Sequence, residues 1–279
     1  ADADLISGGH GSDTIYGDAG ADTISGGDEA DMIYGGVDAD LISGGHGSDT
    51  IYGDAGADTI AGDDDTDMIY GGADADTISG GAGADTLMGG AGDDTIMGGA
   101  DSDVAVFAGK QADYTFASSA DGLTLTVTDT QTGDADTITG VETLRFDDAD
   151  IGVSLNTAEN RMVLTGTSAA DTITVVGNVG IEIPGTDGAD ILTGDRGDDV
   201  FEGGADADDI AGGAGDDYID GGADDDRVFG YGGADTLFGS GGSDLISGGE
   251  GDDYIDGGAD GDRISGGDGA DSIFGSGGA

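Results

Sequence analysis

The chain has 279 residues, of which 62 are Gly, one is Pro and none is Cys. It carries 61 acidic and only six basic side chains, so its formal net charge at pH 7 is −55. This charge repels phosphate, which excludes nucleic acids and anionic membranes as partners. Without Cys there is no disulfide framework and no thiolate metal site, and no apolar run is long enough for membrane insertion.

Residues 1–103 form a first array of nine-residue units of the form G-G-x-G-x-D-x-U-x, where U is a large apolar residue. High charge and low hydrophobicity would favour disorder, but a strict period is typical of a repeat architecture. Residues 2–24 recur unchanged as 38–60, which indicates a duplication. The aspartates at the sixth position of the unit follow one another at an unbroken interval of nine: Asp4, Asp13, Asp22, Asp31, Asp40, Asp49, Asp58, Asp67, Asp76, Asp85, Asp94 and Asp103.

Residues 104–165 have a different character, because Gly becomes rarer and β-branched or aromatic residues alternate with polar ones. This period of two predicts strands near 104–107, 114–116, 123–127 and 144–146. Asp121 with Gly122, and Gly133 with Asp134, suit hairpin turns. We therefore expect a small, mainly antiparallel β module between the two arrays.

Residues 166–279 return to the repeat, which is regular from about residue 186. The first unit is degenerate, because the step from Asp171 to Asp190 is one position longer than two units and the extra residue falls near Pro184. We expect this first coil to lack a regular metal site. The sixth-position aspartates of the second array are Asp190, Asp199, Asp208, Asp217, Asp226, Asp235, Asp244, Asp253, Asp262 and Asp271.

Each unit combines a glycine-rich turn with a short strand, x-U-x. The glycines permit positive backbone dihedral angles, and alternation along the strand turns U inward and its two neighbours outward. One turn and one strand make half a coil, so two successive units complete one coil. Strands that are one coil apart then stack in parallel at about 4.8 Å. The sequence thus predicts an all-β chain with two parallel β-rolls, separated by the antiparallel module.

The units closely resemble the calcium-binding nonapeptide repeats of the RTX (repeats-in-toxin) family, over roughly 1–103 and 186–279. The resemblance implies calcium-stabilised β-rolls and type I secretion from a Gram-negative bacterium. It also implies a chain that is unfolded in the calcium-poor cytosol and folds outside the cell or at its surface. Both ends of the chain lie inside repeats, so we expect it to be a piece of something longer or a unit that continues end to end.

Stacked aspartates also predict calcium from their charge alone. Two unit charges one strand spacing apart repel by roughly 3 to 4 kcal/mol at an effective dielectric constant near 20. A hard divalent cation removes this repulsion, and turn carbonyls with paired carboxylates supply the oxygen ligands that Ca²⁺ prefers over the smaller, more firmly hydrated Mg²⁺. If each pair of aspartates two units apart brackets one ion, about 18 Ca²⁺ bind. A solvated acidic face is the alternative, but it leaves the period and the glycines without a role.

The outward positions carry aromatic rows whose members recur about once per coil. These rows either suit exposed strands and were copied by duplication, or they form a contact surface for another copy or a glycan. The residues concerned are Tyr16, Tyr34, Tyr52 and Tyr70 in the first array and Tyr218, Phe238, Tyr254 and Phe274 in the second.

Our leading hypothesis is an extracellular structural protein, such as part of a surface layer, a fibre or an adhesin, that assembles with other copies head to tail or laterally. The alternatives are the repeat region of a secreted enzyme or toxin whose catalytic part lies elsewhere, and a roll that binds carbohydrate or ice. We expect no catalysis within these residues, because the two histidines, His10 and His46, are repeat copies and calcium already explains the carboxylates.

Overall fold

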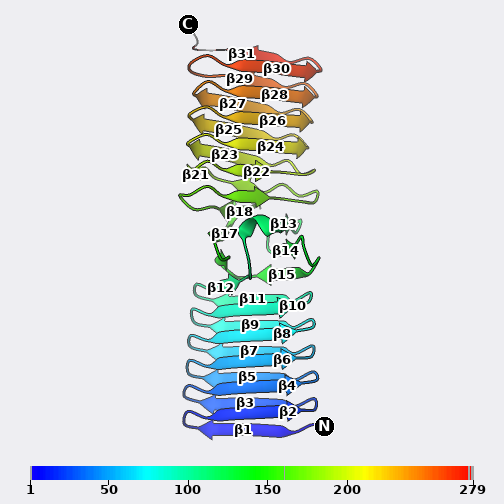
Figure 1. Cartoon of the computed structure of the whole chain (residues 1–279), viewed down its shortest axis with the longest axis vertical. Coiled ribbons are helices and arrows are strands. Elements are labelled where there is room, and N and C mark those ends of the chain that lie inside the picture. Colours follow the sequence, from blue (N-terminus) through cyan, green and yellow to red (C-terminus); the bar gives the residue numbers. More distant parts are fainter. Residues whose placement is uncertain (1, 160, 276, 278–279) are drawn as a thin grey trace. The chain divides into compact units, whose positions relative to one another are not determined.

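The computed structural model describes residues 2–159, 161–275 and 277, and they fold into strands joined by tight turns (Figure 1). Helix in this part of the chain is limited to one short 3-10 turn, η1 (Gln111–Asp113), and none is long and apolar enough to cross a membrane. The residues divide into two compact units, 1–109 with 124–147 and 110–123 with 148–279. Each unit therefore contains one repeat array and part of the segment 104–165.

In the first unit, successive repeats alternate between two parallel sheets, so that each coil gives one strand to each sheet. Strands that are one coil apart pair in register, as Ile24 does with Ile42. We call these coils roll 1. One sheet holds β1 (Leu5–His10), β3 (Thr23–Asp28), β5 (Leu41–His46), β7 (Thr59–Asp64), β9 (Thr77–Ala82) and β11 (Thr95–Ala100). The other holds β2 (Thr14–Ala19), β4 (Met32–Val37), β6 (Thr50–Ala55), β8 (Met68–Ala73), β10 (Thr86–Ala91) and β12 (Val104–Val106).

The strands extend beyond the x-U-x triplet that the sequence predicts, as β3 and β5 show over Thr23–Asp28 and Leu41–His46. Pairing covers x-U-x and resumes one position later, as where Gly9 pairs with Gly27 and His10 with Asp28. Consecutive coils have the same length, so the backbone of the glycine turn also stays in register and forms hydrogen bonds between parallel strands. The parallel roll itself confirms the predicted fold class.

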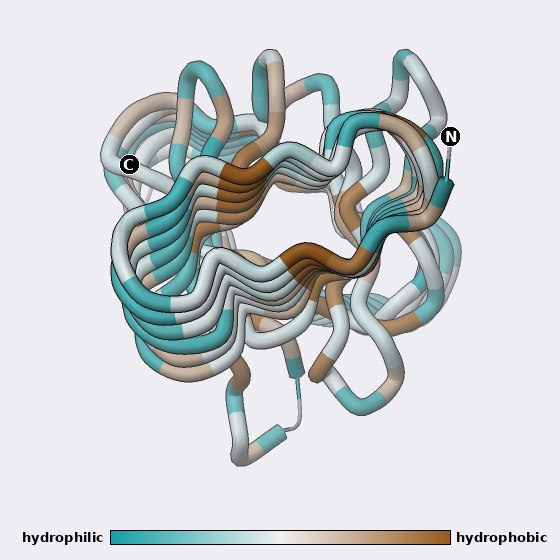
Figure 2. The backbone as a smooth tube through the Cα atoms, turned by 90° about the horizontal axis from the view of Figure 1, so that it is seen from below, coloured by the Kyte–Doolittle hydropathy of each residue, from teal (hydrophilic) through white to brown (hydrophobic). Residues whose placement is uncertain are grey.

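The core of roll 1 is a double column of aliphatic side chains. Ile33, Ile51, Ile69 and Leu87 are fully buried in one sheet, and the other sheet contributes an equivalent column. Figure 2 shows these hydrophobic positions facing each other between the two walls of the roll, with hydrophilic residues at the turns. Burying one Ile side chain contributes about 1.5–3 kcal/mol, so the repeated column is the main apolar contribution to stability.

Part of segment 104–165 adds one more coil to roll 1. β15 (Ala135–Thr139) pairs in parallel with β11, and β16 (Thr143–Arg145) pairs in parallel with β12. β14 (Leu125–Asp129) pairs with β15 in the antiparallel sense, as the sequence predicts for this segment. Ile138 and Leu144 are buried beyond Ile96 and Ala105, so the core column continues into residues outside the repeat.

The second unit contains roll 2, again with two parallel sheets. One sheet holds β19 (Thr172–Thr174), β22 (Ile191–Thr193), β24 (Asp209–Ala214), β26 (Arg227–Gly232), β28 (Leu245–Glu250) and β30 (Arg263–Asp268). The other holds β20 (Glu182–Ile183), β21 (Thr186–Asp187), β23 (Val200–Ala205), β25 (Tyr218–Ala223), β27 (Thr236–Gly241), β29 (Tyr254–Asp256) and β31 (Ser272–Phe274). β17 (Asp150–Asn156) and β18 (Arg161–Thr165) form an antiparallel pair before it, and β13 (Tyr114–Ser118) follows η1.

Candidate metal-binding ladders

The predicted aspartates form two columns in each roll, at the turns that precede the strands of each sheet. In roll 1 the backbone N–H of each aspartate up to Asp85 donates to the Oδ1 atom of the equivalent aspartate one coil later, at 2.6–2.9 Å. We call these columns ladders. Ladder 1A contains Asp4, Asp22, Asp40, Asp58, Asp76 and Asp94, and ladder 1B contains Asp13, Asp31, Asp49, Asp67, Asp85 and Asp103.

Roll 2 repeats the arrangement, with the equivalent hydrogen bonds at 2.8–3.2 Å. Ladder 2A contains Asp171, Asp190, Asp208, Asp226, Asp244 and Asp262, and ladder 2B contains Asp199, Asp217, Asp235, Asp253 and Asp271. The stacking that the nine-residue period predicts is thus present in both rolls. The assignment of these aspartates as metal ligands stays a prediction, and it does not include Asp171, whose coil we expect to lack a regular metal site.

The second carboxylate oxygen, Oδ2, distinguishes these aspartates from ordinary turn residues. In most ladder positions it is buried and has no hydrogen-bond partner within the described part of the protein. An unpaired polar atom away from water costs about 1–3 kcal/mol, and a charged one costs more. The atoms concerned are Oδ2 of Asp13, Asp22, Asp31, Asp40, Asp49, Asp58, Asp67, Asp76, Asp85, Asp94 and Asp103, and of Asp208, Asp217, Asp226, Asp235, Asp244 and Asp253.

Each of these Oδ2 atoms faces a small space that a glycine leaves open. A β-carbon built on Gly53 would lie 2.5 Å from Asp58 Oδ2 and 2.5 Å from the carbonyl oxygen of Gly71. The same two kinds of oxygen, a carboxylate and a glycine carbonyl one coil on, converge beside most position-1 glycines. A cradle that consists of carboxylate and carbonyl oxygens fits a hard cation such as Ca²⁺.

Electrostatics support the same conclusion, because ionised carboxylates are unfavourable in this environment without a cation. Burial, and to a lesser extent the charges of neighbouring aspartates in the ladder, raise the pKa of Asp67 and Asp76 to about 7 against the opposing effect of the N–H donor. Burial likewise raises the pKa of Asp217 and Asp226 to about 7. Among the described residues, neither a cationic side chain nor a donor to Oδ2 relieves Asp67.

No group of three or more His, Cys, Asp or Glu side chains converges on a single point within the described ranges. A cation at a ladder would therefore take its ligands from one or two carboxylates and from turn carbonyls. Such an all-oxygen set fits Ca²⁺, whereas a transition metal would call for imidazole or thiolate.

The first coil of roll 2 differs from the others, as its longer spacing suggests. Asp171 Oδ2 accepts from the backbone N–H of Thr167 at 2.6 Å, and the Thr186 hydroxyl donates to Asp190 Oδ2 at 3.3 Å. These two oxygens therefore have partners in the protein itself, unlike those of the regular coils.

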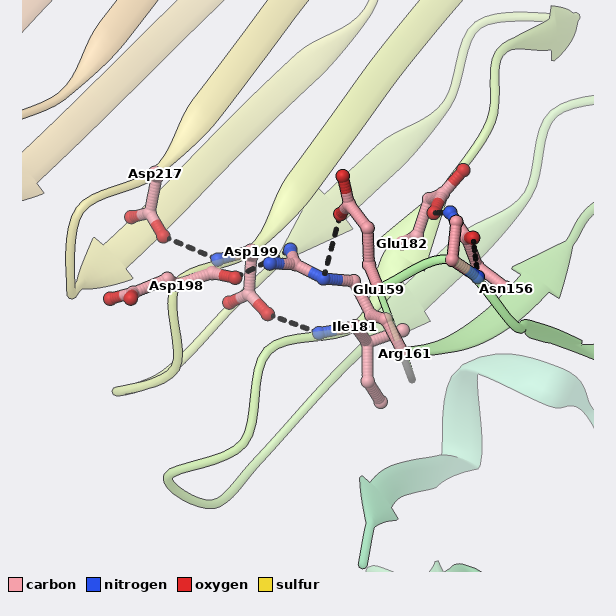
Figure 3. A network of polar contacts seen from close by, with 9 residues as sticks. Asn156, Glu159, Arg161, Ile181, Glu182, Asp198, Asp199 and Asp217 are labelled. Atoms are coloured by element: carbon pink, nitrogen blue, oxygen red, sulfur yellow. Dashed lines mark hydrogen bonds and ion pairs between the residues drawn. The ribbon is translucent and has the colours of Figure 1, made fainter. Parts of the chain in front are cut away.

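Ladder 2B begins beside a cationic side chain (Figure 3). Ile181 occupies the place of a stacked aspartate, and its N–H donates to Asp199 Oδ1 at 2.8 Å. Arg161 Nη1 donates to the carbonyl oxygen of Asp198 at 2.6 Å, and Arg161 Nε lies 3.9 Å from Glu159 Oε2. Burial raises the pKa of Asp199 to about 6, while the N–H of Ile181 and the charge of Arg161 act against this rise. Sequence reasoning missed this arrangement, because Arg161 lies in the non-repeat segment 104–165 and Asp199 lies in the second repeat array, so no repeat spacing connects them.

Sequence reasoning also missed Asp136 and Glu142, which continue the ladders of roll 1. The backbone N–H of Asp94 donates to Asp136 Oδ1 at 2.9 Å, and that of Asp103 donates to Glu142 Oε2 at 2.9 Å. The available signal was short: Asp136, Thr137 and Ile138 repeat the D-x-U part of the unit outside the regular period.

The predicted contact residues form continuous rows on the outer faces. Tyr16, Tyr34, Tyr52 and Tyr70 stack with ring centroids 4.7–5.0 Å apart and ring planes within 6° of parallel. Tyr34 and Tyr52 therefore present ring edges outward, because neighbouring rings cover both of their faces. In roll 2 the rings are tilted at centroid distances of 5.4–5.8 Å, in the order Tyr218, Phe238, Tyr254 and Phe274. Their role as a contact surface stays a prediction.

His10 and His46 lie at the surface, where their Nδ1 atoms are 2.5 and 2.6 Å from carboxylate oxygens of Asp28 and Asp64. Each pair joins adjacent coils of roll 1 and lies outside the ladders.

Comparison with known proteins identifies the family of the repeats. A search of curated proteins found no match. Among solved structures, the crystal structure of the extracellular lipase LipA from Serratia marcescens is similar at 21% identity and a TM-score of 0.32, over 74% of this chain and 33% of the lipase. The chain thus spans about a third of that lipase. The model of the RTX calcium-binding nonapeptide repeat matches residues 1–33, 25–60, 34–69, 43–78, 70–105, 184–219, 202–237, 212–246, 229–264 and 256–279. Because these matches cover well over half of its length, the chain belongs to the RTX calcium-binding nonapeptide repeat family.

Proposed function

We propose that this chain is a calcium-dependent structural protein that folds outside the cell, where Ca²⁺ fills the ladders of both rolls. The observation that carries the proposal is the row of buried Oδ2 atoms that have no hydrogen-bond partner among the described residues, most of which face a carbonyl-lined cradle. With one ion between each pair of stacked aspartates, about 18 Ca²⁺ bind. They add about 36 positive charges and reduce the net charge from −55 to about −19.

Binding and folding are one equilibrium in this proposal. A cradle exists only when two coils are already stacked, and stacking places like charges one strand spacing apart, at a cost of roughly 3 to 4 kcal/mol per neighbouring pair. Several such pairs exceed the usual folding margin of about 5–15 kcal/mol. The chain is therefore disordered where calcium is scarce and ordered where it is plentiful, which suits a protein exported from a Gram-negative cell before it folds.

Within this proposal the chain is a scaffold, not an enzyme. Its repeat carboxylates are committed to the ladders, and its aliphatic side chains fill the two rolls. The outer aromatic row of roll 2, where Tyr218 and Tyr254 are each 39% exposed, offers a lateral contact to another copy. If the chain is instead the repeat region of a secreted enzyme or toxin, it has the same calcium chemistry but no tendency to associate.

Circular dichroism with and without millimolar Ca²⁺ tests the folding part of the proposal. We expect a disordered spectrum in excess chelator and a β spectrum on addition of calcium. An ordered chain in excess chelator at pH 8 would contradict it. Sedimentation velocity and electron microscopy in calcium test association separately, and dispersed monomers at high concentration would leave the calcium scaffold standing but refute assembly.

A further inference from the structure

The coil that closes roll 1 comes from sequence outside the repeat. Thr95, Ile96 and Met97 of β11 pair with Thr137, Ile138 and Thr139 of β15 in the register that joins ordinary coils. β16 continues the second sheet in the same way from β12. The segment 134–145 therefore stands where the next coil of the array would stand. The step along the chain is longer, because Asp94 and Asp136 are 42 residues apart whereas Asp76 and Asp94 are 18 apart.

On ladder 1A this coil supplies the next carboxylate. The contact from Asp94 N–H to Asp136 Oδ1, 2.9 Å, reproduces the contact from Asp76 N–H to Asp94 Oδ1, 2.8 Å. Asp136 is 9% exposed and Asp94 is 1% exposed, and Asp94 Oδ2 has no hydrogen-bond partner among the described residues. Two buried carboxylates are thus stacked at this joint, as in the regular coils.

On ladder 1B the coil supplies both a carboxylate and a cradle. A β-carbon built on Gly98 would lie 2.5 Å from Asp103 Oδ2 and would overlap the carbonyl oxygen of Gly140. In an ordinary coil that second oxygen belongs to the equivalent glycine of the next coil. A β-carbon built on Gly80, for example, would lie 2.7 Å from the carbonyl oxygen of Gly98. Asp103 is fully buried, its Oδ2 is unpartnered in the described structure, and its N–H donates to Glu142 Oε2.

We propose that Asp94 with Asp136, and Asp103 with Glu142 and the Gly140 carbonyl, form two additional calcium sites that fasten segment 134–145 to roll 1. All of these ligands are oxygen atoms, and the longer Glu side chain spans the joint where an Asp stands in the repeat. This inference rests on the proposed function of the ladders, and it adds a role for non-repeat residues. The segment is a calcium-dependent cap, and its order depends on the last joints of the two ladders.

The double variant Asp136→Asn with Glu142→Gln tests the proposal. Each amide keeps an oxygen to accept the N–H of Asp94 or Asp103, but removes the charge and one of the two carboxylate oxygens. Asp147→Asn is the matched control, because Asp147 is an exposed acid two residues beyond the same segment, and its Oδ2 accepts the Gly109 N–H at 3.2 Å. Native mass spectrometry counts the bound Ca²⁺, and hydrogen exchange during a calcium titration follows each part of the full-length chain.

We expect the double variant to bind about two fewer ions than the wild type. The calcium concentration needed to protect the amides of 135–145 should rise about tenfold or more. Protection of amides 41–64 in the middle of roll 1 should remain as in wild type, which shows that the roll itself is folded. An unchanged ion count, or unchanged protection of 135–145, would overturn the proposal. Failure of the proposed function is a different result, in which calcium protects no part of the wild-type roll.

Discussion

The role of a single buried ladder carboxylate can be tested through the replacement Asp67→Asn, whose effect should change sign with calcium. Asp67 Oδ1 accepts the Asp49 N–H at 2.8 Å, and the amide oxygen of Asn can keep this contact. The Oδ2 atom, which is buried and unpartnered in the described structure, becomes an NH₂ group without charge. The Asp67 N–H still donates to Asp85 Oδ1. The variant therefore changes charge and oxygen ligation with little change in shape.

The magnitude follows from the ladder spacing. In a fully ionised ladder Asp67 has two neighbours at about 4.8 Å, and each repels it by about 3.5 kcal/mol at an effective dielectric constant of 20. Without calcium, Asp67→Asn should therefore favour the ordered state by up to about 7 kcal/mol at pH 8. With calcium, two joints lose a ligand. If each ion contributes about 2.7 kcal/mol at a concentration of 100 times its dissociation constant, the variant is less stable than wild type by up to about 5 kcal/mol.

The assay is urea unfolding followed by circular dichroism, in saturating calcium and in metal-free buffer at pH 8. Asp65→Asn is the control: it removes one charge from the same turn, but its side chain is exposed and its φ of 75° is one that Asn tolerates. The control should show a small change of the same sign in both buffers. If Asp67→Asn destabilises the chain equally with and without calcium, the carboxylate acts as a hydrogen-bond acceptor alone and the ladder argument is refuted.

Three further predictions follow from the same geometry. Gly53→Ala should abolish calcium-dependent order around β6 even in excess calcium, because its β-carbon fills the cradle. Gly232→Ala, whose β-carbon meets only an oxygen 3.9 Å away, should leave calcium-dependent order nearly unchanged. Calcium titrations followed by circular dichroism compare the two variants. Arg161→Gln should raise the calcium concentration needed to protect the amides of 181–200 in hydrogen exchange, because Arg161 holds the carbonyl oxygen of Asp198 and its charge lowers the pKa of Asp199. The control Arg227→Gln, which removes an exposed ion pair to Asp209, should leave that concentration unchanged. Acid should partly replace calcium: the pKa of Asp67 is about 7 in the fold and lies near 3.8 when exposed, so folding takes up protons, and the metal-free chain should gain order as pH falls from 8 towards 4. In calcium the same protons compete with the ion, so the calcium midpoint should rise below about pH 7, and an order that is independent of pH in metal-free buffer would contradict this reasoning.

The nine-residue period was sufficient to predict the coils and the stacking of the aspartates, because a unit of constant length leaves one register for successive coils. It was not sufficient for Asp136 and Glu142, which join their ladders far beyond the regular interval from Asp94 and Asp103. The residues between Asp103 and Asp136 carry β12, η1, β13, β14 and the loops that join them, so no fixed interval points to Asp136 or Glu142. Arg161 was missed for a related reason: its approach to Asp198 depends on the hairpin of β17 and β18, which is not periodic.

The length of the strands was underestimated because the glycine turn was assigned to loops. Positions 2 and 3 of each unit show no apolar alternation, yet Gly27 pairs with Gly45 in the parallel pairing of β3 and β5. Their pairing comes from equal coil length, and side-chain pattern gives no sign of it.

The identical register of coils also determines how such a chain can change length. Tyr34 pairs with Tyr52, and Asp31 bonds to Asp49, because both steps equal one coil. Gain or loss of whole coils therefore leaves every remaining ladder, core column and outer row in place, as the repetition of residues 2–24 at 38–60 illustrates. A change of a single unit would instead move everything beyond it to the opposite sheet and bring the aromatic row onto the outer face of that sheet. The length of roll 1 can thus evolve in steps of one coil, while the outer face of each sheet keeps the same kinds of side chain.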